Sequence, residues 1–224
     1  MIQEQWTDVD RYITDLFVPS DSALDATLKA SAEGGLPAIS VAPNQEKMLG
    51  LLAQLCGARN ILEIGTLGGY SAIWMARALP SGGRLITLEA DPEHARVARA
   101  NFARAGLSGT IDLREGPALE TLPKLEAERR GSFDMIFIDA DKPAYPECLA
   151  WSLKLSRKGT LIIADNIVRN GAVLDPAHED PRVHGARRFN ELLAAEPRVS
   201  ATAIQTVGSK GYDGFAMALV ISDS

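Results

Sequence analysis

The amino-acid sequence predicts an α/β fold, a doubly wound, mostly parallel sheet of seven strands with an antiparallel C-terminal hairpin and N-terminal helices packed on it. From residue 61 onward, short apolar runs alternate with segments of helical periodicity, the pattern of parallel strands joined by crossover helices. The last two extended runs are separated by a short polar loop, which is typical of a hairpin. We therefore expect the ligand site beyond the carboxyl ends of the parallel strands.

The first 58 residues are expected to form a helical cap on an α/β core at 59–224, the two together making a single domain. Proline and glycine mark helix ends here: Pro43 suits the first position of a helix, and Gly57 terminates it. Together with apolar residues at helical spacing, such signals predict helices over about 8–17, 21–32 and 44–56.

In the core, each predicted strand is short and apolar, and turn or helix signals separate it from the next. Pro92, for example, suits the first turn of a helix, and Gly106 suits its end. The predicted strands lie at 61–64, 84–88, 111–114, 133–138, 159–164, 199–207 and 214–221. The predicted helices of the core lie at 70–79, 92–105, 118–130, 143–155 and 182–195.

Composition narrows the class of partner. The net charge of −6 and the pI near 5.2 give no support for nucleic-acid binding, which needs a basic face. No apolar run approaches the roughly 18–20 residues that span a bilayer. The N-terminus lacks the basic segment and apolar block of a secretion signal, and Cys56 and Cys148 are expected as buried thiols. We expect a cytoplasmic enzyme with a small-molecule substrate and no nucleic-acid or membrane partner.

A glycine loop follows the strand at 61–64 and precedes a helix, an arrangement that brings backbone N–H groups close to a ligand. After Gly65 the loop lacks the second glycine of the Gly-x-Gly-x-x-Gly dinucleotide pattern, and Glu63 would repel phosphates. S-adenosylmethionine fits better, because it has a sulfonium and a zwitterionic methionyl tail but no phosphate. Glu89, at the end of the second strand, could accept hydrogen bonds from both ribose hydroxyls. The alternatives are a solvated acid at Glu89 and an ion pair with a basic side chain at Glu63.

Acidic and amide side chains end the fourth and fifth predicted strands. Asp139 and Asp165 would lie at adjacent strand tips, about 5 Å apart, and could share a cation with the amide oxygen of Asn166. Three hard oxygen ligands favour Mg²⁺, with Ca²⁺ or Mn²⁺ as alternatives, and leave positions for water and substrate. Such a metal could bind two neighbouring substrate oxygens and lower a hydroxyl pKa. Lys142, one turn after Asp139, could take the phenolic proton. The alternative is that these acids only form turns.

These stretches together resemble the cation-dependent class I S-adenosylmethionine O-methyltransferases of the catechol and caffeoyl-CoA type, in a short form like the bacterial ones. The resemblance covers the chain from about residue 37 to its end. The matching stretches are Ile-Ser-Val-Ala-Pro-Asn-Gln at 39–45, Leu-Glu-Ile-Gly-Thr-Leu-Gly-Gly-Tyr-Ser at 62–71, Leu-Glu-Ala-Asp at 88–91, Phe-Asp-Met-Ile-Phe-Ile-Asp-Ala-Asp-Lys at 133–142 and Asp-Asn-Ile-Val-Arg-Asn-Gly at 165–171. The run Asp-Ala-Asp-Lys with a later Asp-Asn is the specific part, since most class I methyltransferases share the glycine loop.

The resemblance implies a role for each matching position. The residues that would line the methyl donor are Val41, Glu63, Gly65, Thr66, Ser71, Glu89, Ala118 and Asp141. The residues that would hold the metal are Asp139, Asp165 and Asn166. Lys142 would be the catalytic base, and Asn170 would approach the substrate. The resemblance also implies a homodimer in which the N-terminal helices help to close the site.

The expected reaction methylates one hydroxyl of a catechol-like small molecule. The metal would chelate two vicinal oxygens, Lys142 would assist loss of one proton, and the oxyanion would attack the sulfonium methyl in line. Two alternatives stay open. An NAD(P)-dependent oxidoreductase would need a loop that accepts a pyrophosphate, and a non-catalytic S-adenosylmethionine-binding protein would not need Lys142 beside the metal ligands.

Overall fold

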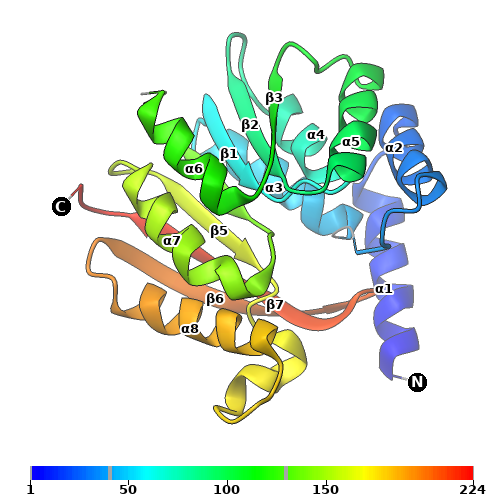
Figure 1. The fold of residues 1–224 in the computed structure, drawn as a ribbon. Helices are drawn as coiled ribbons and strands as arrows, with labels where there is room; N and C mark the ends of the chain where they lie inside the picture. The colour runs from blue at the N-terminus through cyan, green and yellow to red at the C-terminus, as the bar shows by residue number, and fades with distance from the viewer. Residues whose placement is uncertain (1, 40–41, 129–130, 224) are drawn as a thin grey trace.

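A seven-stranded sheet forms the centre of the computed structural model, which describes residues 2–39, 42–128 and 131–223 (Figure 1). The strand order is β3-β2-β1-β4-β5-β7-β6. The strands are β1 (Asn60–Ile64), β2 (Arg84–Glu89), β3 (Ile111–Glu115), β4 (Met135–Ile138), β5 (Leu161–Asp165), β6 (Val199–Gly208) and β7 (Gly211–Val220). Strands β1 to β5 pair in parallel, whereas β7 runs antiparallel to both β5 and β6. The predicted fold class is confirmed.

The sheet is covered on both faces, which is why its central strands are apolar along their length. In β1 and β4, successive side chains alternate between two core clusters: Leu62 and Ile136 pack in one, and Ile61 and Met135 in the other. The helices on the first face are α6 (Ala118–Ala127), α7 (Tyr145–Lys154) and α8 (Pro181–Ala195). The helices on the other face are α2 (Ser22–Glu33), α3 (Pro43–Leu55), α4 (Tyr70–Arg77) and α5 (Pro92–Arg104).

Helix α1 (Ile2–Phe17) has no buried residue and lies beside the tip of the β6–β7 hairpin (Figure 1). Asp10 joins it to two other segments. One Asp10 oxygen accepts from the Ser209 backbone N–H at 2.7 Å, and the other accepts from the Asn44 amide at 3.1 Å. These bonds bring α1, the start of α3 and the hairpin tip together. Within the described ranges, no helix is long and apolar enough to cross a membrane.

Several predicted boundaries and one burial prediction need correction. Helix α1 begins at Ile2 rather than at residue 8. Strand β7 begins at Gly211 rather than at residue 214, because the hairpin turn is shorter than predicted. Both cysteines are free, and Cys148 is buried, but Cys56 is exposed at the end of α3, so the prediction of two buried thiols is wrong there. The prediction that one domain consists of a helical cap at 1–58 and an α/β core at 59–224 stays a prediction.

Candidate active site

The glycine loop between β1 and α4 is held against the end of β4. The Gly65 N–H donates to the Leu88 carbonyl at 3.0 Å, and the Asp139 N–H donates to the Ile64 carbonyl at 2.9 Å. Gly65 has a φ of +94°, and a Cβ there would lie 2.2 Å from the Asp139 carbonyl oxygen. Only glycine permits this approach. The loop and the first predicted metal ligand are therefore built as one unit.

Glu63 is enclosed below the loop, with 0% of its surface exposed. Its carboxylate accepts hydrogen bonds from three hydroxyls, those of Thr66 at 2.7 Å, Ser71 at 2.5 Å and Thr87 at 2.5 Å. Burial raises the pKa of Glu63 to about 7, against the opposing effect of these hydroxyls. No basic side chain among the described residues pairs with it, so the ion-pair alternative is wrong. Glu63 thus fixes one hydroxyl each from the glycine loop, the first turn of α4 and β2.

Glu89 ends β2 and faces the loop rather than bulk solvent. One carboxylate oxygen accepts from the backbone N–H groups of Leu67 at 2.8 Å and Thr66 at 3.3 Å. The other accepts from the Asp91 N–H at 3.0 Å and lies 3.6 Å from the His94 ring. The solvated-acid alternative is therefore wrong, because Glu89 is buried and joins the loop to the start of α5.

The other described residues that were predicted to line the methyl donor lie near the same ends of the strands. Ser71 is in the first turn of α4, and Ala118 begins α6, close to the end of β2 through the Gly116-to-Glu89 backbone bond of 2.8 Å. Asp141 is exposed and precedes the short 3₁₀ helix η1 (Lys142–Ala144). Val41 lies outside the described residues.

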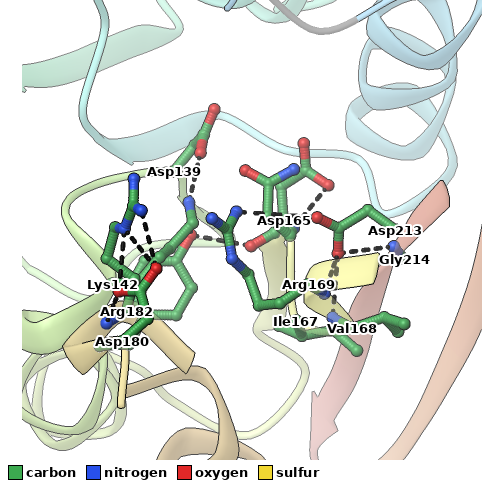
Figure 2. A network of polar contacts seen from close by, with 12 residues as sticks. Asp139, Lys142, Asp165, Ile167, Val168, Arg169, Asp180, Arg182, Asp213 and Gly214 are labelled. Carbon is green, nitrogen blue, oxygen red and sulfur yellow. Dashed lines mark hydrogen bonds and ion pairs between the residues drawn. The ribbon is translucent and has the colours of Figure 1, made fainter. Parts of the chain in front are cut away.

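Lys142 is a buried cation whose ammonium group is surrounded by acceptors. Its Nζ donates to Asp139 at 2.8 Å, to the Ala140 carbonyl at 3.2 Å and to the Tyr145 hydroxyl at 2.7 Å (Figure 2). The Tyr145 hydroxyl in turn lies 2.9 Å from the Asp165 carbonyl oxygen. Tyr145 thus links the ends of β4 and β5, and Lys142 is positioned beside the predicted metal ligand.

Asp165 is 4% exposed, and one of its oxygens accepts from the Gln45 amide at 3.2 Å and from the Asn166 N–H at 2.8 Å. Burial, followed by the negative charge of Asp139, raises the pKa of Asp165 to about 7. The two carboxylates therefore repel each other, and Lys142 neutralises only part of their charge. Gln45, which was not among the predicted site residues, orients Asp165.

These side chains fit a hard divalent cation. Two carboxylates and the Asn166 amide oxygen are ligands that Mg²⁺ accepts, and a cation would relieve the repulsion between Asp139 and Asp165. Asn166 is held at a φ of +56° directly after β5. Among the described residues, no group of three His, Cys, Asp or Glu side chains is arranged to hold a metal ion. The third ligand of a metal here would have to be the amide.

A tight turn after β5 positions Asn170, and an acid from β7 anchors that turn. Arg169 and Asn170 both have left-handed backbones, with φ of +55° and +56°. One Asp213 oxygen accepts from the N–H groups of Val168 and Arg169, each at 2.9 Å, and the other lies 3.7 Å from the Arg169 guanidinium (Figure 2). Asp213 was not among the predicted site residues, and its only signal in the sequence is an acid at the start of an apolar strand.

A cavity of about 520 Å³ opens beside these ligands. Of the predicted site residues, it is lined by Asp165, Asn166 and Asn170. Its other walls come from α1, the start of α3 and the hairpin, and include the apolar side chains of Met48 and Phe215. Asp139, Lys142 and the glycine loop lie outside this lining, so the cavity adjoins the end of β5 rather than the loop.

The fold and the acid-tipped strands define a class I methyltransferase. A family model described as O-methyltransferase matches residues 18–219, and the chain belongs to this family. This membership excludes the oxidoreductase alternative.

Similar proteins support the same assignment. The chain is 60% identical to a catechol O-methyltransferase of Niastella koreensis, over 95% of this chain and 96% of that protein. It is 59% identical to an O-methyltransferase of Bacillus cereus solved with SAH (S-adenosylhomocysteine), with a TM-score of 0.96 over 97% of this chain and 99% of that one. It is 50% identical to the Streptomyces achromogenes O-methyltransferase TomG solved with SAM, with a TM-score of 0.96 over 99% and 100% of the two chains.

Proposed function

We propose that this enzyme transfers the methyl group of S-adenosylmethionine to one hydroxyl of a catechol-like phenol, assisted by a divalent cation, with Mg²⁺ the best candidate. The observation that carries the proposal is the position of Asp165 and Asn166. They line a cavity large enough for an aromatic ring, and Tyr145 and the charges of Asp139 and Lys142 link Asp165 to the Asp139–Lys142 pair. Similarity to a catechol O-methyltransferase and to proteins solved with SAH or SAM supports both substrates.

On the donor side, the glycine loop and the ends of β1 and β2 would hold S-adenosylmethionine. Glu89 would exchange its hydrogen bonds from the loop for bonds from the ribose hydroxyls. Ser71 and Thr66, fixed by Glu63, would bind the methionyl tail near the N-terminus of α4. Val41 and Ala118 would complete the donor site.

On the acceptor side, Asp139, Asp165 and Asn166 would hold the metal, and Asn170 would contact the acceptor. When bound, the metal supplies Lewis acidity that favours the ionised form of an adjacent hydroxyl. Gln45 keeps one Asp165 oxygen in place, so the carboxylate is oriented before any ligand arrives. The apolar wall formed by Met48 and Phe215 suits the face of an aromatic ring.

Lys142 is proposed as the base that accepts the phenolic proton. In this structure the Lys142 ammonium donates to Asp139 at 2.8 Å. Asp139 would share its carboxylate between Lys142 and a bound cation, and Nζ would then be placed beside the acceptor hydroxyl to accept its proton. Tyr145 and the Ala140 carbonyl keep Nζ in position through that transfer.

A homodimer is proposed from the surface of α1. Val9, Leu16 and Phe17 are exposed on this helix by 49%, 58% and 63%, an apolar face that a second copy would cover. Leu16→Asp is expected to convert a dimer into a monomer in light scattering after size exclusion, whereas Glu4→Gln is not. A monomeric wild-type enzyme at micromolar concentration would contradict this. The cytoplasmic location stays a prediction.

The acceptor proposal is tested by comparing three positional isomers. Methyl transfer from S-adenosylmethionine is measured with catechol, resorcinol and hydroquinone in the presence of Mg²⁺. Only catechol has adjacent hydroxyls that one metal ion can bind together, so only catechol is expected to be methylated at a substantial rate. Equal rates for the three isomers would contradict chelation of a vicinal diol.

A further inference from the structure

Glu46 is a buried acid in the first turns of α3 that none of the roles above uses. Its side chain is 1% exposed, and its Oε2 atom accepts no hydrogen bond in the part of the chain that the structure describes. A buried carboxyl oxygen without a donor is costly, because it has lost its water and gained nothing in return. Such a group in an enzyme indicates a partner that arrives with the ligand.

The position of Glu46 on α3 directs it toward the active site. Ala42 lines the acceptor cavity, and residues four apart lie on the same face of a helix. The preceding residue, Gln45, bonds to Asp165. Helix α3 packs against α4, and the charge of Glu46 acts on Tyr70, the first residue of α4 after the glycine loop.

Among the described residues, the charged groups that act on the Glu46 carboxyl are all acidic. In order of strength they are Glu63 from β1, Asp139 after β4 and Asp165 from β5, and Glu46 in turn acts on the pKa of Tyr70 in α4. Burial and these three negative charges raise the pKa of Glu46 well above its usual value. The nearby cation Lys142 is already paired with Asp139. In the described part of the chain, the surroundings of Glu46 therefore carry negative charge that no unpaired cation among these groups offsets.

We propose that Glu46 binds the ammonium group of the methionyl tail of the methyl donor. The inference rests on the proposed function, which supplies a ligand with two cationic groups. The sulfonium must face the acceptor cavity for methyl transfer, which leaves the ammonium for the tail end of the site. Glu63, the strongest charge acting on Glu46, fixes Ser71 at that end. An ammonium there would donate to Oε2 and satisfy the unpaired oxygen.

The test measures binding of two ligands that differ in the tail. Isothermal titration with S-adenosylhomocysteine and with 5′-methylthioadenosine, which lacks the amino-acid end, is carried out in EDTA so that metal binding does not contribute. Glu46→Gln is expected to weaken S-adenosylhomocysteine binding roughly tenfold or more, the usual effect of losing a charged hydrogen bond. Binding of 5′-methylthioadenosine is expected to stay unchanged. The exposed Glu33→Gln variant on α2 is the matched control.

Two results would overturn the proposal. Unchanged binding of S-adenosylhomocysteine would show that Glu46 does not contact the tail, and an equal loss for both ligands would show a purely structural role. A melting curve separates misfolding from lost binding: ligand-free Glu46→Gln is expected to melt at or above the wild-type temperature, because it no longer buries a carboxyl. Wild-type protein that binds neither ligand would instead overturn the proposed function.

Discussion

The buried Glu63 carboxyl makes a quantitative prediction about stability. Its pKa is raised from 4.5 to about 7 in the folded enzyme, mainly by burial. Because the folded state holds this proton more tightly than the unfolded chain, the contribution of Glu63 to stability is fully present below pH 4.5. It is lost as the pH rises through about 7. Glu63→Gln removes the titration and keeps an amide that can bond to the three surrounding hydroxyls.

The magnitude follows from the two pKa values. One pKa unit corresponds to about 1.4 kcal/mol, so the full change attributable to Glu63 is about 3 kcal/mol. Between about pH 5 and about pH 8, the free energy of unfolding of the wild type should therefore fall by about 2–3 kcal/mol more than that of Glu63→Gln. Most of this difference should develop between about pH 5 and about pH 7.

The assay is urea unfolding followed by circular dichroism at a series of pH values, with metal removed by EDTA. Only the difference between variant and wild type is used, because other groups titrate in both proteins. The exposed Glu4→Gln variant should follow the wild type at every pH. Parallel curves for Glu63→Gln and wild type would refute the reasoning, since they would mean that Glu63 titrates alike in the folded and unfolded states.

Three further predictions concern the site. Gly65→Ala adds a Cβ 2.2 Å from the Asp139 carbonyl oxygen, at a residue with a positive φ. Because the positive φ alone costs roughly 1–2 kcal/mol, both the melting temperature and the S-adenosylhomocysteine affinity should fall. An unchanged melting curve would contradict the close approach. Glu89→Ala should weaken S-adenosylhomocysteine binding about tenfold or more by calorimetry, and an unchanged affinity would argue against the ribose role. Lys142→Met should lower kcat by about 10²–10⁴ and leave S-adenosylhomocysteine affinity intact; a near-normal kcat would exclude Lys142 as the base.

The sheet and most of the residues at the carboxyl ends of its strands could be predicted from the sequence, because both depend on local patterns and general geometry. Apolar runs of four to six residues identify buried parallel strands, and the parallel arrangement places their carboxyl ends together. Asp139, Asp165 and the glycine loop could therefore be assigned to one site before any contact was known. The prediction that the glycine loop does not bind a dinucleotide rested on one missing glycine and on Glu63, and both are visible in the sequence.

Contacts between distant segments could not be predicted in this way. Asp213 anchors the turn at Val168 across 45 residues of sequence, and nothing in either segment specifies that pairing. In the sequence, Glu46 is an ordinary polar residue of a predicted helix. Its burial depends on how α3 packs on α4, which the sequence does not specify. Cys56 was wrongly expected to be buried, because helical periodicity does not say how far the last turn of α3 extends beyond the core.

The central claim is that methyl transfer depends on a cation held at the ends of β4 and β5. The most direct test is the initial rate of catechol methylation by EDTA-treated enzyme during a Mg²⁺ titration, for wild type and Asp165→Ala, after calorimetry has shown that both bind S-adenosylhomocysteine. We predict no activity of the wild type in EDTA, saturable recovery with Mg²⁺, and no recovery for Asp165→Ala. Full wild-type activity in EDTA would contradict the claim.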